Sequence, residues 1–427
     1  MHIALRAPYT AFGALAEWAV ALAPAKGGKK TASLVGRRGI LERFAHWGAA
    51  HRDTARPLVW LHAPSVGEGL QARPVIELLR RHHPEAQLVY TYYSPSAERF
   101  ALGVGADYAD FLPFDTRSAA RALLDALRPT AIVFSKLDVW PVLVDEAVAR
   151  GVRVGLIAAT LDDKSGRRGA LGRALLGDAY AALHRVGAID AVNAERLTAL
   201  GVRGDRISVT GDTRYDQVWA RAALADRNSA LLAPFADDRP TVVAGSTWPS
   251  DERILEAAWR AVRLAHPAVR LVIAPHEPTP AHLAPIEEWI RREQWTGARL
   301  SAGTAASADV VVVDRTGALG DLYALADIAY VGGGFHAAGL HSVLEPAAFG
   351  TPVLFGPRFA ASRDAELLIE AGGGGAVDNA RSLEEALLGW LGDDGVRARA
   401  GARARAMVQS GLGAAERSAE LVASLFV

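Results

Sequence analysis

The sequence alternates short apolar runs with segments of helical spacing. Leu58–Ala63 is an apolar run too short for a helix, and Gln71–Arg81 then carries Val and Leu residues at helical intervals. Because short buried runs that alternate with helices predict parallel strands covered on both faces, this pattern predicts an α/β fold. Further runs of this first series are Gln87–Tyr92, Ala131–Phe134, Val152–Ala158, Arg185–Ile189 and Ile207–Thr210.

A second series begins at Thr241–Gly245 and continues with the runs Val269–Ala274, Val310–Val313, Ile328–Val331 and Val353–Phe355. Residues 217–239, between the two series, carry no strand pattern and predict a linker. We therefore expect two doubly wound, Rossmann-like domains, at 39–216 and 240–400, whose strand ends face one another across a cleft. Residues 401–427 predict C-terminal helices, which can pack back on the N-terminal domain.

Composition excludes several classes of function. The chain has 427 residues and no cysteine, which excludes disulfides, thiolate nucleophiles and cysteine-based zinc sites. Lys plus Arg and Asp plus Glu both number 47, so no net charge draws the molecule to nucleic acid. No nucleic acid partner is expected.

The N-terminal segment is nevertheless basic, since residues 1–57 contain nine Lys or Arg and three Asp or Glu. Within it, Tyr9–Ala25 is apolar but shorter than a membrane span and interrupted by Glu17. An apolar helix next to basic residues favours an element that lies in the membrane interface, assigned to residues 1–38. Two alternatives are a cleaved signal peptide, which Glu17 disfavours, and a helix packed on its own domain.

Glu68 is the first candidate for chemistry. It lies in Ser65-Val66-Gly67-Glu68, just past the first strand of the core, where a carboxylate can accept a proton from an approaching hydroxyl. The alternative is a capping box, in which Ser65 and Glu68 bond the free backbone donors of the helix. Glycines on both sides, Gly67 and Gly69, favour close approach of a ligand.

A glycine-rich loop in the second series is the next candidate. Gly332, Gly333 and Gly334 follow a strand, so their backbone N–H groups could approach an anion, although the loop could also be a tight turn. Glu345 follows, and its carboxylate could accept both hydroxyls of a ribose. Together they favour nucleotide binding.

Polar residues end three other strands. Lys136 and Asp138 could form an ion pair or contact an anionic substrate. Ser246 and Thr247 could cap a helix or hold a phosphate, and His276 could be structural or functional. The sequence contains no Asp-x-Asp pair, no Gly-x-x-x-x-Gly-Lys-Ser/Thr loop and no Gly-x-Ser-x-Gly elbow. These absences count against a metal–diphosphate site, an ATPase and a common hydrolase.

Five motifs occur in one order: His62–Glu68, Trp140-Pro141, Gly211–Asp216, Ala244–Trp248 and Gly332–Pro346. Together they resemble the 3-deoxy-D-manno-octulosonic acid (Kdo) transferases of bacterial lipopolysaccharide assembly. The resemblance extends from the N-terminal helix to about Ala376.

The resemblance implies a GT-B fold and an enzyme that moves Kdo from CMP-Kdo to a lipid A precursor. It implies a place at the cytoplasmic face of the inner membrane, peripheral or anchored by the N-terminal helix, and no metal or other cofactor. Glu68 would be the general base of an inverting reaction. The implied donor-binding residues are Ser246, Thr247, His276, Gly332, Gly333, Gly334, Ser342 and Glu345, and the implied acceptor or anion contacts are Ser65, Gly67, Lys136, Asp138 and Arg214.

The chain departs from the family pattern at several positions. Lys136 replaces an acid, Ala158–Asp162 replaces Asn-Ala-Arg-Leu-Ser, Ser342 replaces an asparagine, and Ala274-Pro275-His276-Glu277 lacks an arginine. Two other functions stay open. One is a different nucleotide-sugar enzyme, either a UDP-sugar transferase or an epimerase. The other is a membrane-surface protein that binds a nucleotide or glycolipid without catalysis.

Overall fold

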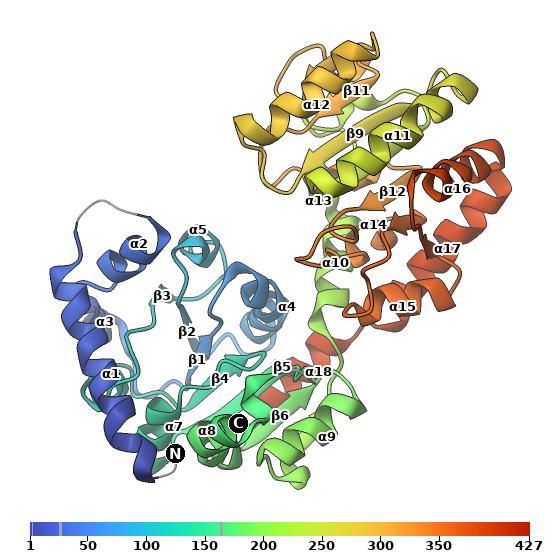
Figure 1. Ribbon diagram of the computed structural model, residues 1–427. Helices are drawn as coiled ribbons and strands as arrows, with labels where there is room; N and C mark the ends of the chain where they lie inside the picture. Colours follow the sequence, from blue (N-terminus) through green and yellow to red (C-terminus); the bar gives the residue numbers. More distant parts are fainter. Residues whose placement is uncertain (2, 25–27, 163–164) are drawn as a thin grey trace. The chain divides into compact units, whose positions relative to one another are not determined.

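The computed structural model describes residues 1, 3–24, 28–162 and 165–427 (Figure 1). Lys26, part of the predicted basic segment, lies outside these ranges. The chain forms two compact units, an N-terminal unit of Met1–Gln217 with Leu412–Val427 and a C-terminal unit of Val218–Gly411. The linker was predicted to begin at residue 217. In the structure this residue lies inside helix α10 (Thr213–Leu224).

Within the described residues, the N-terminal unit contains a seven-stranded parallel sheet in the order β3-β2-β1-β4-β5-β6-β7. The central strands are buried on both faces, as their continuous apolar runs predicted. The strands are β1 (Leu58–His62), β2 (Gln87–Tyr92), β3 (Tyr108–Phe111), β4 (Ala131–Ser135), β5 (Arg153–Ala159), β6 (Arg185–Ala188) and β7 (Ile207–Val209).

Helices cover both faces of this sheet. They are α1 (Ile3–Leu22), α2 (Lys29–Gly36), α3 (Ile40–His51), α4 (Val66–His82), α5 (Glu98–Ala101), α6 (Arg117–Leu127), α7 (Pro141–Ala149), α8 (Ala170–Ala182), α9 (Ala191–Leu200) and α18 (Ala414–Ala423). Although α18 ends the chain, Leu421, Val422 and Leu425 join the core of the N-terminal unit. Asp216 accepts hydrogen bonds from the backbone N–H groups of Gly413 (2.8 Å) and Ala415 (3.0 Å), which fixes the start of α18.

The C-terminal unit contains, within the described residues, a second seven-stranded parallel sheet in the order β10-β11-β9-β8-β12-β13-β14. The fold class predicted from the alternating runs is therefore confirmed. Its strands are β8 (Thr241–Thr247), β9 (Arg270–Pro275), β10 (Gly297–Arg299), β11 (Val310–Val312), β12 (Ile328–Val331), β13 (Val353–Phe355) and β14 (Gly374–Ala376). Its helices are α11 (Pro249–Ala265), α12 (Pro280–Arg292), α13 (Leu319–Leu322), α14 (Leu344–Ala348), α15 (Arg363–Glu370), α16 (Ala380–Gly392) and α17 (Asp394–Ser410).

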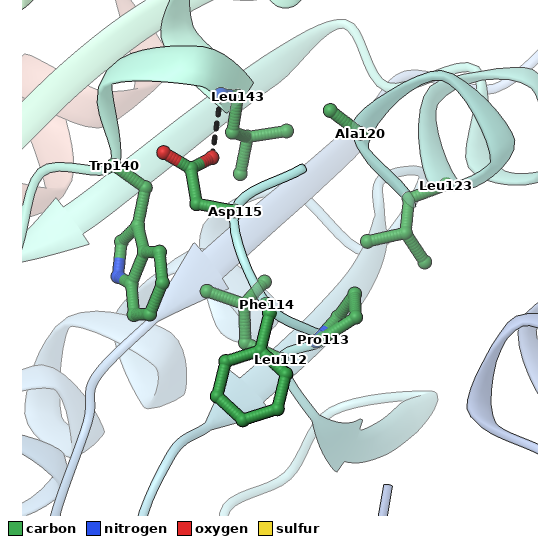
Figure 2. A pocket seen from close by; sticks show the side chains of 8 residues that line it. All are labelled: Leu112, Pro113, Phe114, Asp115, Ala120, Leu123, Trp140 and Leu143. Carbon is green, nitrogen blue, oxygen red and sulfur yellow. Dashed lines mark hydrogen bonds between the residues drawn. The ribbon is translucent and has the colours of Figure 1, made fainter. Parts of the chain in front are cut away.

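Asp115 joins helix α1 to the rest of the N-terminal unit. Its carboxylate accepts a hydrogen bond from the Tyr9 hydroxyl (2.8 Å), and also bonds from the backbone N–H groups of Val142 (2.9 Å) and Leu143 (2.8 Å) in the first turn of α7. Figure 2 shows the bond to Leu143, with Trp140 beside the same carboxylate. One buried acid thus caps α7 and anchors α1, and one face of α1 packs on its own unit.

Another face of α1 is exposed and apolar. Phe12, Leu15, Trp18 and Leu22 expose about 70% of their surface, at 71%, 68%, 70% and 68%. Their spacing places them on one side of the helix. Among the described residues, no helix is long and apolar enough to cross a membrane.

Candidate functional site

In the N-terminal unit, the candidate site lies at the carboxyl end of β1 and β4. These strands pair in parallel, with His62 opposite Phe134, so the segments that follow them leave the sheet at the same edge. Glu68, in the first turn of α4, and Lys136, directly after β4, therefore meet. The Lys136 Nζ lies 3.2 Å from the Glu68 Oε1.

Ser65 does not cap helix α4 with its side chain, as the capping-box alternative for Ser65 and Glu68 required. Its hydroxyl accepts no backbone N–H at the start of α4 and instead donates a hydrogen bond to the Glu68 Oε2. The Glu68 side chain keeps 18% of its surface exposed. The carboxylate is thus oriented by two donors and still accessible, which is the geometry that a general base needs.

The charge state of Glu68 follows from three effects. Burial raises its pKa, while the hydrogen bond from Ser65 and the positive charge of Lys136 lower it. The effects that lower the pKa outweigh burial, so the pKa of Glu68 lies below its ordinary value. Glu68 is therefore ionised and able to accept a proton at neutral pH.

Lys136 adopts a backbone conformation that non-glycine residues rarely use. Its φ is +65°, in the left-handed region, and its backbone N–H donates to the Ile157 carbonyl at 2.8 Å. The Ser135 hydroxyl just before it donates to the Glu68 carbonyl at 3.3 Å. Strained residues of this kind concentrate at functional sites, so the strain at Lys136 supports a functional role for the lysine.

Asp138, also predicted from the strand end, closes a buried hydrogen-bond network. Its Oδ2 lies 3.0 Å from both the His62 Nε2 and the Trp140 Nε1. The other His62 nitrogen lies 2.9 Å from the Thr91 hydroxyl, which accepts a bond from the Trp60 indole at 2.9 Å. Burial raises the pKa of Asp138, but the bond from His62 and other donors more than offset it and lower the pKa.

Arg167 belongs to this site but was missed by sequence reasoning. It lies in a short 3-10 turn at Gly166–Arg168, and its positive charge helps to lower the pKa of Asp138. Its buried Nε has no hydrogen-bond partner among the described residues. The Arg-Arg pair after the fifth strand was the available signal, but such basic pairs are common in proteins.

Three other predicted residues lie in ordinary surroundings. A Cβ at Gly67 would meet only the Ser65 hydroxyl, at 3.7 Å, so packing does not require that glycine. At Gly69 a Cβ would lie 2.5 Å from Phe100, so this glycine serves packing rather than ligand approach, contrary to the prediction. Arg214 forms an ion pair with Asp212, two residues earlier, at 2.6 Å.

In the C-terminal unit, the buried carboxylate of Asp251 organises the candidate nucleotide site. Asp251 lies in the first turn of α11 and is 0% exposed. It accepts hydrogen bonds from the backbone N–H groups of Trp248 (3.0 Å), Gly333 (2.9 Å) and Phe335 (3.3 Å), and from the Tyr330 hydroxyl (3.0 Å). This role could not be predicted from the sequence, because an acid at that position is also an ordinary helix-start residue.

Two of the three glycine N–H groups in the loop are bonded within the C-terminal unit. The Gly332 N–H donates to the Gly245 carbonyl at 2.8 Å, and the Gly333 N–H is held by Asp251. A Cβ at Gly333, whose φ is +94°, would lie 2.2 Å from the Gly339 carbonyl oxygen, and one at Gly334 would lie 2.5 Å from the Gly356 nitrogen. The expectation that Gly332 and Gly333 offer free N–H groups to an anion is therefore wrong, and their small size serves backbone packing instead.

The strand-end hydroxyls differ from each other. Thr247 is buried and its hydroxyl donates to Glu252 at 2.9 Å, which is a structural bond. Ser246 is partly exposed, and its φ of +54° lies in the left-handed region where the register of β8 and β9 shifts. Of the two, Ser246 is the residue placed to contact a ligand.

His276 belongs to an aromatic cluster. Trp248 stacks on His336, with ring centroids 3.9 Å apart, and on His276, with centroids 4.8 Å apart. His341 lies 4.6 Å from His276, and its Nε2 accepts a bond from the Trp248 indole at 3.2 Å. Of these four residues, only His276 was predicted as a site residue, because contacts between the segments at Trp248, His276 and His336–His341 arise only in the fold.

Glu345 and Ser342 lie near this cluster in sequence. Burial raises the pKa of Glu345, and Arg221 acts in the opposite direction. Within the described part of the chain, no hydrogen bond reaches the Glu345 carboxylate, so it can accept hydroxyls of a ligand. Ser342 is exposed. Among the described residues, no three or more histidines or acids are grouped to hold a metal ion.

Comparison with known proteins identifies relatives across most of the chain. A family model described as 3-deoxy-D-manno-octulosonic-acid transferase (kdotransferase) matches residues 38–217. The 3-deoxy-D-manno-octulosonic acid transferase of Bordetella pertussis is 31% identical over 88% of this chain and 89% of its own length. The Haemophilus influenzae enzyme of the same name is 25% identical over 90% of this chain and 91% of its own length.

Among solved structures, a UDP-GlcNAc 2-epimerase from Neisseria meningitidis superposes with a TM-score of 0.62 at 15% identity, covering 86% of this chain and 99% of that one. At that identity the likeness shows the fold alone.

The Asp251 network yields a stability prediction. Asp251→Ala leaves three backbone N–H groups and the Tyr330 hydroxyl without their acceptor, and we expect it to lower the free energy of unfolding by about 3–5 kcal/mol. Glu252→Ala, in the same helix turn, removes one bond from Thr247 and should cost about 1 kcal/mol. Urea unfolding measures both, and equal losses would contradict the special role of Asp251.

Proposed function

The chain belongs to the family of 3-deoxy-D-manno-octulosonic acid (Kdo) transferases, and we propose that it transfers Kdo from CMP-Kdo to a lipid A precursor in lipopolysaccharide core biosynthesis, with Glu68 as the general base. The observation that carries the proposal is the ionised, accessible Glu68 carboxylate in the unit that the family model matches.

In the proposed reaction, Glu68 accepts the proton of the acceptor's sugar hydroxyl as that oxygen attacks the anomeric carbon of Kdo. Attack from the face opposite CMP inverts the configuration, and CMP leaves with the bonding electrons. Lys136 bonds the Glu68 Oε1 and Ser65 bonds Oε2, and each oxygen keeps a second lone pair that can accept a bond from the incoming hydroxyl. Asp138 and Arg167 are further proposed contacts for polar groups of the acceptor, since the charge of Arg167 acts on Asp138.

The donor would bind in the C-terminal unit. Glu345 can accept the ribose hydroxyls, and Ser246 and His276 lie at strand ends where a phosphate can be held. Ser342, which is exposed, is a further proposed donor contact. CMP departs as a monophosphate ester, so this chemistry leaves no diphosphate for a metal to neutralise.

We place the enzyme at the cytoplasmic face of the inner membrane, held by α1. The exposed stripe of Phe12, Leu15, Trp18 and Leu22 suits the apolar side of an interfacial helix. The lipid acceptor and the enzyme would then be at the same membrane surface.

The direct test incubates purified protein with CMP-Kdo and a tetraacylated lipid A precursor and weighs the glycolipid by mass spectrometry. A mass gain of one or more Kdo units supports the proposal. Competition of CMP against UMP distinguishes it from a UDP-sugar enzyme, because cytosine and uracil differ at the pyrimidine 4-position.

Replacing the proposed base should abolish most of the transfer. We expect Glu68→Gln to lower kcat by about 10²–10⁴-fold, because it keeps the size of the side chain and removes the proton acceptor. Glu77→Gln, in the same helix at an exposed ion pair with Arg73, is the matched control and should leave kcat unchanged. Near-normal turnover of the Glu68 variant would reject the role.

Lys136 should set the acid side of the pH profile. Lys136→Met removes a charge that lowers the pKa of Glu68, so that pKa rises and more of the base is protonated at mildly acidic pH. We expect the acid limb of the kcat/KM profile to move to higher pH, whereas Lys136→Arg should keep it in place. A limb that does not move in Lys136→Met would disprove the electrostatic role.

The membrane role of α1 is testable with vesicles. Replacing Leu15 and Trp18 by Ser removes two exposed apolar side chains, and we expect about tenfold weaker co-flotation with vesicles that contain anionic phospholipid. Leu264→Ser removes a leucine of α11 that is even more exposed, at 83%, and should not change flotation. If the double variant binds vesicles as well as the unchanged protein does, this face of α1 does not contact the membrane.

A further inference from the structure

A pocket in the N-terminal unit lies between the start of helix α8 and helix α9, both labelled in Figure 1. Its volume is about 450 Å³, and Arg168, Arg173 and Arg196 line it. Among the described residues that line it, none is acidic. We call it the arginine pocket. Three guanidinium groups around one pocket indicate an anionic ligand, because arginine forms paired hydrogen bonds with phosphate and carboxylate groups.

The fold holds the two walls of the arginine pocket together. The Arg196 Nη1 donates to the Leu161 carbonyl at 3.0 Å, which attaches α9 to the loop after β5. The end of α9 also packs closely on α8, since a Cβ at Gly201 would lie 3.2 Å from the Gly177 carbonyl oxygen. Arg173, in the first turn of α8, is exposed, and its guanidinium has no hydrogen bond or ion pair within the described residues. Arg173 is therefore a charged donor that can bond a ligand.

The segment before α8 adds smaller donors to the three arginines. Gly169, which also lines the pocket, is the N-cap of α8 and supplies no side-chain cap. The positive end of the helix dipole therefore lies at the pocket. The Ser165 hydroxyl accepts the backbone N–H of Arg167 at 3.4 Å, so its own proton remains available to a ligand. These groups suit an anion that accepts several hydrogen bonds.

The charge and the volume of the arginine pocket favour a phosphate monoester. Such a group carries about two negative charges at neutral pH, so it matches three arginines better than a single carboxylate does. Pockets that bind small molecules usually measure about 300–1,000 Å³. The arginine pocket, at about 450 Å³, therefore has room for a phosphate together with the sugar that carries it.

The arginine pocket lies off the same sheet edge as the proposed base. β5 pairs in parallel with β4, so the segment after β5, which contains Arg168, leaves the sheet at the edge where Glu68 and Lys136 meet. Helix α8 is also tied to that site, because the Tyr180 hydroxyl donates to the carbonyl of Leu137 at 2.9 Å. A molecule whose hydroxyl lies at Glu68 can thus extend toward these arginines.

We propose that the arginine pocket binds a phosphate group carried on a sugar of the acceptor, with Arg168, Arg173 and Arg196 as its donors. The identity of the acceptor rests on the proposed function, whereas recognition of a sugar phosphate rests on the pocket itself. These arginines act in binding and not in proton transfer. Their loss should therefore raise the KM for the acceptor and leave kcat at saturating acceptor unchanged.

Binding of a sugar phosphate can be measured in the full-length protein without any transfer reaction. The probe is glucosamine 1-phosphate, observed by ligand NMR, and glucosamine, which lacks the phosphate, should not bind. Inorganic phosphate should bind at least about tenfold more weakly than the probe, because it lacks the contacts of the sugar. Equal affinity for inorganic phosphate and for the probe would overturn the assignment of a sugar phosphate.

A single exposed arginine provides the sharpest variant. We expect Arg173→Gln to weaken binding of glucosamine 1-phosphate about tenfold, because it removes charge-assisted hydrogen bonds. The side chain is exposed, so the variant should fold, which circular dichroism checks. The matched control is Arg203→Gln, which changes an exposed arginine paired with Asp205 outside the pocket and should bind the probe normally.

Kinetics test whether the acceptor supplies the phosphate. The double variant Arg168→Gln/Arg173→Gln should raise the KM for a phosphorylated, tetraacylated lipid A precursor about tenfold or more, with unchanged kcat and an unchanged KM for CMP-Kdo. With a precursor whose phosphates have been removed, the variant and the unchanged protein should have the same KM. A difference in KM that persists without the phosphates would overturn the inference.

The remaining outcomes separate this inference from the proposed function. Kdo transfer with the acceptor KM and probe binding both unchanged in the variants would overturn the inference and leave the proposed function in place. Probe binding that depends on Arg173, without detectable Kdo transfer, would support the pocket and contradict the proposed function. If the variants lose co-flotation with phosphatidylglycerol vesicles but bind the probe normally, the arginines contact membrane phospholipid and the inference is wrong.

Discussion

The parallel pairing of β1 with β4 is the constraint on which the N-terminal site depends. The two strands are neighbours in the sheet although about 70 residues separate them in the chain, and the register places His62 opposite Phe134. Because both strands run in the same direction, the segments that follow them leave at one edge. Glu68 then meets Lys136, and His62 meets Asp138. A slip of the register would break both contacts together.

In the C-terminal unit, the loops after neighbouring parallel strands also leave the sheet at one edge, but a buried carboxylate lies there. β8 lies between β9 and β12, so the loops after these three strands converge on the first turn of α11. There the backbone N–H groups are already bonded to Asp251, a carboxylate with no exposed surface. The N–H groups of Gly332 and Gly333 are therefore not available to a ligand at this edge.

Much of the fold could be predicted because buried parallel strands are continuous apolar runs, as at Val310–Val312. Three strands gave no such signal: Tyr108–Phe111 contains an aspartate, Gly297–Arg299 is largely exposed, and Gly374–Ala376 is nearly all glycine. In the sites, residues at strand ends were predictable from position, which is how Glu68, Lys136 and His276 were found. Asp251, His336 and Arg167 were not predictable, because their roles depend on contacts with residues distant in sequence.

The exposure of Lys136 bears on how a paired carboxylate can still act as a base. An ion pair restrains Glu68, and proton transfer to the carboxylate removes the charge that Lys136 neutralises. Since the Lys136 side chain is 46% exposed, solvent screens the pair, and pairs of this kind contribute about 0–1 kcal/mol. That is small beside the barrier of a glycosyl transfer, so the lysine can yield to an incoming hydroxyl at little cost. The bond from Ser65, on the other carboxylate oxygen, also orients Glu68.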